Sequence, residues 1–169
     1  PVQWLLGNAP VDARWCLVHA THLEADEVRG IAASGAVAGL CPITEANLGD
    51  GLFPMREFVQ HGGCFGVGSD SNVLIDAAEE LRLLEYGQRL ALRGRNVVSP
   101  GELSSGRWLY QQAQNGAAQA LGVGAGLAVG EAADLVELDT AHPSLHGRDG
   151  DALLDSWVFA ARGGAVRAV

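Results

Sequence analysis

An aspartate at the end of a short apolar segment is the first candidate for chemistry in this chain. Residues 64–67 (Cys-Phe-Gly-Val) predict a buried strand, and the chain then passes through two small residues to Asp70. In a parallel α/β barrel the carboxyl ends of the strands form the catalytic face, so a carboxylate there is a candidate metal ligand or proton acceptor. The structural alternative is that Asp70 or Ser71 caps the next helix.

A histidine occupies the equivalent place on an earlier segment. Residues 15–19 form a continuous apolar run of strand length that ends in His19, and His22 follows three residues later. Two strands of one parallel sheet would bring His19 and Asp70 to the same rim. There the carboxylate could bind metal and take a proton from water, and the imidazole could stabilise developing charge. The alternative is a strand-end histidine bonded only to backbone; we expect His22 to orient the loop.

A polar segment follows the middle strand at the same rim. Residues 44–51 (Thr-Glu-Ala-Asn-Leu-Gly-Asp-Gly) are rich in Gly and Asn, which predicts an irregular loop. Thr44, Glu45 and Asn47 are candidates to bind a polar substrate or to brace the site. A loop whose side chains satisfy its own backbone is the competing interpretation.

The elements that must position these residues alternate along the chain. Strands are expected over residues 15–19, 37–41 and 64–68, with helices between and after them to about residue 92. A capping box at Thr21 and Glu24 predicts the start of the helix that ends near Ser34. Short strands buried on both faces and separated by helices predict an α/β fold with a parallel sheet. Three strands cannot close a barrel, so we expect further strands outside this chain.

The C-terminal part has a different pattern. Ser99, a proline after it and Glu102 predict a helix start, and a second helix is expected over residues 114–121. Short strands are expected over residues 133–138, 157–160 and 166–169, with residues 140–151 as a polar connection. The predicted organisation is a partial barrel (1–97), packing helices (98–122) and strands of a small β-subdomain (123–169).

Composition excludes several functions. The 169 residues carry a net charge of −9 and no lysine, which excludes a lysine Schiff base or a P-loop lysine within the chain. The acidic balance argues against nucleic acid as a partner, and no apolar run is long enough to cross a membrane. The three cysteines lie in or beside apolar runs, as buried free thiols of a cytoplasmic protein would. Glu79 and Glu80 are expected on a solvated helix face, and the arginines at 82, 89 and 93 in surface ion pairs.

Taken together, several segments resemble one family. They are residues 17–23 (Leu-Val-His-Ala-Thr-His-Leu), 39–54 around Thr-Glu-Ala-Asn-Leu-Gly-Asp-Gly, 66–71 (Gly-Val-Gly-Ser-Asp-Ser), 84–90 and 129–136. The chain resembles the C-terminal portion of the formimidoylglutamate deiminases of the amidohydrolase superfamily. The resemblance implies strands six to eight of a distorted (β/α)8 barrel plus strands of a small β-sandwich. It also implies a small-molecule substrate and a homodimer.

The resemblance also implies roles for two residues. Asp70 matches the aspartate that binds the family's single zinc ion and accepts a proton from water, and His19 matches the histidine that assists attack on the substrate. The implied reaction is hydrolysis of N-formimino-L-glutamate to N-formyl-L-glutamate and ammonia. Zinc would lower the pKa of its bound water.

The chain departs from the family pattern in what it lacks. The His-x-His pair, the further zinc histidine and the proton-shuttling glutamate of the family have no counterpart among these residues. We therefore expect a fragment that is inactive alone and does not hold zinc tightly, with the arginines for the substrate carboxylates elsewhere. The alternatives are another deaminase of the superfamily acting on a purine-like ring, and a non-catalytic α/β module.

Overall fold

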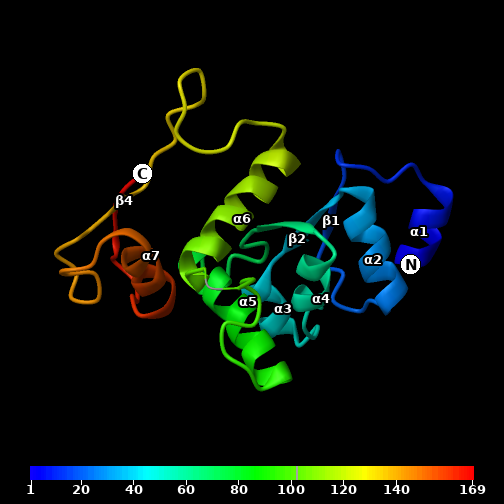
Figure 1. Ribbon diagram of the computed structural model, residues 1–169, viewed down its shortest axis with the longest axis horizontal. Coiled ribbons are helices and arrows are strands. Elements are labelled where there is room, and N and C mark those ends of the chain that lie inside the picture. The colour runs from blue at the N-terminus through cyan, green and yellow to red at the C-terminus, as the bar shows by residue number, and fades with distance from the viewer. Residues whose placement is uncertain (102) are drawn as a thin grey trace.

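A computed structural model gives the structure of the chain and describes residues 1–101 and 103–169 (Figure 1). Helices and strands alternate through the first half, and the two termini lie toward opposite ends of the long axis. The elements in chain order are α1 (Val2–Asn8), β1 (Cys16–Val18), α2 (Ala25–Ser34), β2 (Val37–Leu40), α3 (Pro42–Leu48), α4 (Met55–Gln60), β3 (Cys64–Val67), α5 (Ala77–Leu92), α6 (Ser105–Leu121), β4 (Glu137–Leu138), α7 (Gly150–Phe159) and β5 (Val166–Ala168).

The first three strands form one parallel sheet in the order β1-β2-β3. Val18 pairs with Gly39, and Leu40 pairs with Val67, so the carboxyl ends of all three strands lie at one edge. The prediction of an α/β fold with a parallel sheet is confirmed. The prediction that every strand is buried on both faces is wrong for β1, in which Cys16 and Val18 are exposed. Within the described residues β1 pairs only with β2, which leaves its outer side open.

The helix that follows β1 begins later than expected. Glu24 is the N-cap of α2, and its side chain and that of Glu27 form the reciprocal capping box, so the box predicted at Thr21 and Glu24 is wrong. The carboxylate at the third helical position bonds the backbone N–H of Glu24 at 2.9 Å. The predicted end of this helix is confirmed, because Gly35 takes the left-handed conformation that glycine adopts without strain.

The segment expected to be an irregular loop is mostly helical. α3 begins at Pro42 directly after β2 and ends at Gly49, whose φ of 73° is left-handed. Proline at the first helical position favours the start, and the glycine that suggested a loop is instead the C-cap. The prediction of an irregular structure over residues 44–51 is therefore wrong for residues 44–48.

Two further expectations fail in the C-terminal part. The helices predicted from Ser99 and over residues 114–121 are one helix, α6, capped by Ser104; Glu102 lies outside the described residues. The strand expected over residues 157–160 is the end of helix α7, in which Trp157 and Val158 are buried. Antiparallel pairing of β4 with β5 confirms only a small β-element here, and the β-sandwich stays a prediction.

Two buried charged side chains of α5 contact backbone groups of α3 and of the end of α7. Arg82 is buried and donates hydrogen bonds to the carbonyls of Val158 and Ala161 (2.6 Å each) at the end of α7. Glu80 is also buried, with 2% of its surface exposed. Arg82 does form an ion pair, with Glu79, but it is buried, so the expectation of a surface pair is wrong only in its exposure. The expectation that Glu80 lies on a solvated face is wrong. Both polar side chains are buried because they satisfy backbone groups of neighbouring helices.

Helix α6 packs directly on β3. A Cβ atom at Gly116 would clash with the carbonyl of Phe65, so the helix and the strand approach each other as closely as they do only because residue 116 is glycine. Phe65 is buried beneath this contact and packs against Trp108 of the same helix. Close packing of α6 on β3 fixes the strand that leads to Asp70.

Two remaining expectations concern the burial of the three thiols and the presence of a membrane-spanning segment. Cys41 is buried and Cys64 half-buried, but Cys16 is exposed, so the expectation of three buried thiols is wrong for Cys16; all three are free. In the described part of the chain, no helix combines the length and the hydropathy that crossing a lipid bilayer requires.

Candidate active site

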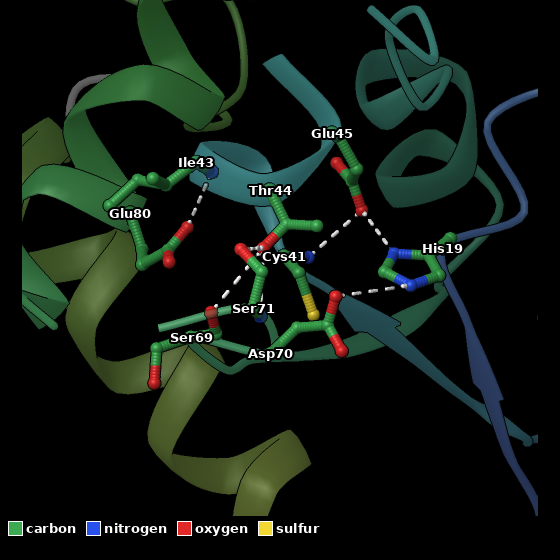
Figure 2. A network of polar contacts seen from close by, with 9 residues as sticks. All are labelled: His19, Cys41, Ile43, Thr44, Glu45, Ser69, Asp70, Ser71 and Glu80. Atoms are coloured by element: carbon green, nitrogen blue, oxygen red, sulfur yellow. Dashed lines mark hydrogen bonds and ion pairs between the residues drawn. The ribbon is translucent and has the colours of Figure 1, made fainter. Parts of the chain in front are cut away.

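His19 and Asp70 lie side by side at the carboxyl edge of the sheet. His19 directly follows β1, and Asp70 is the third residue after β3. The Nε2 atom of His19 is 3.8 Å from Oδ2 of Asp70, with 34% and 45% of the two side chains exposed (Figure 2). The sequence-based prediction that both residues reach one rim is therefore confirmed in geometry.

Backbone conformation turns both side chains toward this point. His19 has a φ of 65° and Asp70 a φ of 40°, values uncommon for residues other than glycine. The N–H of His19 still donates to the carbonyl of Gly39 at 2.8 Å, so the chain turns immediately after its last ladder contact. Residues held in such conformations cluster at functional sites. The alternative that Asp70 or Ser71 caps the next helix is wrong, because Asp76 caps α5.

Glu45 contacts the other ring nitrogen of His19. Its Oε1 atom lies 3.2 Å from Nδ1 of His19 and accepts a hydrogen bond of 2.9 Å from the backbone N–H of Cys41. Only 5% of the Glu45 side chain is exposed. In Figure 2 the ring of His19 stands between the two carboxylates, with Nδ1 toward Glu45 and Nε2 toward Asp70.

Thr44, the preceding residue of α3, fixes the loop that carries Asp70. Its Oγ1 accepts from the backbone N–H of Ser71 at 3.2 Å and lies 2.8 Å from Oγ of Ser71 and 3.3 Å from the carbonyl oxygen of Ser69. One short helix thus holds both rim residues, His19 through Glu45 and the Asp70 loop through Thr44. These contacts favour the bracing interpretation for both residues, whereas Asn47 is exposed on α3. Substrate binding by the three residues stays a prediction.

A second buried carboxylate supports the start of α3. Oε2 of Glu80 accepts a hydrogen bond of 2.9 Å from the N–H of Ile43, and Oε1 of Glu80 has no partner among the described residues. Burial raises the pKa of Glu80 to about 7, and the neighbouring carboxylates of Glu45, Asp76 and Glu79 add to the rise, while the Ile43 bond opposes it.

The pKa of the Cys41 thiol is affected by burial and by several carboxylates near this edge of the sheet. This pKa is raised to about 11, mostly by burial and in part by the carboxylates of Glu45, Asp70 and Glu80, while a backbone hydrogen bond from Gly68 opposes the rise. The thiol is therefore neutral near pH 7, which is unfavourable for a nucleophile or a thiolate ligand. Carboxyl groups therefore outnumber the single imidazole of His19 at this edge of the sheet.

The donor groups of the described residues do not complete a zinc site. Within residues 1–101 and 103–169 no group of three or more His, Cys, Asp and Glu side chains is arranged to hold a metal ion. A protein zinc site has three or four protein ligands, and here only the Asp70 carboxylate and Nε2 of His19 face a common space. His22, the other nearby histidine, is exposed.

An apolar pocket lies away from this rim. It has a volume of about 680 Å³ and is lined mainly by apolar side chains of α6, α7 and the C-terminal strand pair, including Tyr110, Leu154 and Trp157. Asp76 is its only lining carboxylate. The pocket therefore lacks the groups that the rim provides for acid–base chemistry.

Comparison with known proteins shows the family to which this fold belongs. The Amidohydrolase family model matches residues 4–169, and the chain belongs to that family. The chain is 55% identical over 171 residues to the formimidoylglutamate deiminase of Pseudomonas aeruginosa, and this match covers 100% of the chain and 38% of the relative. The family resemblance inferred from the sequence is confirmed.

Two solved structures have the same fold. An amidohydrolase from Brucella melitensis has a TM-score of 0.88 and 50% identity, covering 98% of this chain and 36% of that one. The atrazine chlorohydrolase of Arthrobacter aurescens, solved in complex with zinc, has a TM-score of 0.73 and 26% identity, covering 94% of this chain and 34% of that one. The chain spans little more than a third of the length of these relatives.

Proposed function

We propose that this chain is part of an enzyme that hydrolyses N-formimino-L-glutamate to N-formyl-L-glutamate and ammonia. Water adds to the formimino carbon, and the bond from that carbon to the terminal nitrogen breaks. The water oxygen remains as the formyl oxygen, and the nitrogen leaves as ammonia with both protons of the water. No redox partner is required.

Two residues of this chain act in the proposed reaction. Asp70 accepts a proton from the attacking water, and Nε2 of His19 accepts a hydrogen bond from the formimino nitrogen, which stabilises the positive charge that develops there as this nitrogen gains protons and leaves. Asp70 holds one proton of the water until it passes to the leaving nitrogen, and we place the group that carries it there outside this chain. The titratable side chains described around the pair are Glu45, which is bonded to His19, and the neutral thiol of Cys41.

We further propose that Asp70 supplies one ligand of a zinc ion whose remaining ligands lie outside residues 1–169. The zinc in the chlorohydrolase structure supports this assignment. A zinc ion at such a site lowers the pKa of a bound water. The chain would then contribute strands six to eight of the barrel, with β1, β2 and β3 in that order.

The observation that carries the proposal is the approach of His19 Nε2 to Asp70 at one strand edge, in a chain 55% identical to a formimidoylglutamate deiminase. The test is ammonia release by the full-length protein from N-formimino-L-glutamate, compared with guanine and adenosine. Turnover of N-formimino-L-glutamate alone is the expected result. Preferred turnover of a purine would move the assignment to another deaminase, and absence of turnover with all three would support a non-catalytic module.

A further inference from the structure

Glu45 contacts the imidazole ring of His19, and this contact favours a role in orienting the ring over a role in binding substrate. We propose that Glu45 is a positioning residue, which holds the His19 ring in one orientation and one tautomer; this rests on the proposed function of His19.

The tautomer follows from the donor and acceptor inventory. A carboxylate can only accept, so the 3.2 Å contact places the proton of His19 on Nδ1. Nε2 is then the nitrogen that faces Asp70 and the open side of the rim. Without Glu45 the ring could exchange its two nitrogens by rotation, and either tautomer could form.

Glu45 itself is held in place from two sides. Its Oε1 accepts from the N–H of Cys41 four residues earlier, and α3 is anchored at the next position by Glu80, which accepts from the N–H of Ile43. Glu45 thus accepts from the N–H of Cys41 and Glu80 from the N–H of Ile43 at the start of α3. Pro42, which lies between Cys41 and Ile43, has no N–H to donate. A side chain that is 5% exposed and already bonded to backbone and imidazole is poorly placed to bind substrate directly.

Substitution of Glu45 in the full-length protein tests this role. Glu45→Ala is expected to lower kcat on N-formimino-L-glutamate about 10- to 100-fold, the usual loss for a partner that orients an active-site group, with KM nearly unchanged. Glu45→Gln keeps an oxygen that can accept from both donors, and it should recover most of this loss. Ala46→Gln changes an exposed position on the same helix and should leave kcat and KM as in the parent.

The ring nitrogens provide a readout that does not depend on turnover. In ¹⁵N-histidine-labelled protein, Nδ1 of His19 should carry the proton in the parent and in the Gln variant, whereas the Ala variant should show mixed tautomers. His19→Asn identifies the resonance. If Glu45→Ala fails to fold, Glu45→Asp retracts the carboxylate by about 1.5 Å while keeping its charge, and should lower kcat in the same way.

The outcomes separate this proposal from the proposed function. A higher KM with unchanged kcat would make Glu45 a substrate ligand and overturn the positioning role, as would an unaltered His19 tautomer in Glu45→Ala. If the parent protein does not hydrolyse N-formimino-L-glutamate, the proposed function fails. The nitrogen spectra then still decide whether Glu45 sets the tautomer of His19.

Discussion

Neutralising Glu80 should change how the stability of this protein depends on pH. The pKa of Glu80 is raised from 4.5 to about 7, first by burial and then by neighbouring carboxylates. A rise of this size corresponds to about 3 kcal/mol of differential stability between the protonated and ionised forms. Since only 2% of the residue is exposed, little solvent screening reduces that figure.

The direction follows from proton binding. Because the pKa is higher in the folded state, the folded protein binds more protons than the unfolded chain between about pH 4.5 and pH 7. The contribution of Glu80 is therefore fully present below pH 4.5 and is lost as pH rises through 7. Glu80→Gln stays neutral and can still accept from the N–H of Ile43, so its free energy of unfolding should lack this decline.

Urea unfolding followed by tryptophan fluorescence at pH 5, 6, 7 and 8 measures the effect. The free energy of unfolding of the parent should fall by about 3 kcal/mol more than that of Glu80→Gln between pH 5 and pH 8. Glu57→Gln removes a partly exposed carboxylate on α4 and should keep the parental slope. Equal slopes for the parent and Glu80→Gln would refute the assignment of a buried, proton-binding Glu80.

Three further predictions follow from the packing and the site. Gly116→Ala should destabilise the protein by more than about 2 kcal/mol in urea unfolding, because the added Cβ would clash with the Phe65 carbonyl. Gly7→Ala is the matched control: it lies on a helix with open space around it and should stabilise the protein by about 0.5–1 kcal/mol. Arg82→Met should lower the melting temperature through a loss of about 3 kcal/mol, since two carbonyls at the end of α7 lose their donor; an unchanged melting temperature would contradict this. Asp70→Asn in the full-length protein should reduce ammonia release at least about 100-fold while the urea midpoint stays near the parental value, and retention of activity would remove Asp70 from the chemistry.

The sequence was sufficient for the parallel sheet and for the meeting of His19 with Asp70. Both depend on local signals: apolar runs of strand length ending in one polar residue, in an order that makes the strands parallel. The helical nature of α3 was missed because Asn47 and Gly49 suggest a loop, although Pro42 and Gly49 are also the residues that start and end a short helix. With α3 taken as a loop, bracing by Thr44 and Glu45 remained one of two interpretations, and their contacts with the Asp70 loop and His19 could not be derived.

The buried charges on α5 were missed for a different reason. Leu81 and Leu84 recur at helical spacing, and Glu80 lies beside them on the buried face, so the periodicity contained the signal. Glu80 and Arg82 were nevertheless predicted to be exposed because glutamate and arginine are seldom buried. Glu80 accepts from the N–H of Ile43, and Arg82 donates to carbonyls at the end of α7; only the tertiary structure shows these distant partners. Arg82 also pairs with Glu79, three residues earlier on the same helix.

A crystal structure of the full-length protein with N-formyl-L-glutamate bound tests most directly whether His19 and Asp70 form the active site. The formyl group should lie within about 3.5 Å of Nε2 of His19 and beside the Asp70 carboxylate, at the carboxyl edge of the sheet. A formyl group bound elsewhere, with His19 and Asp70 both facing solvent, would contradict this assignment.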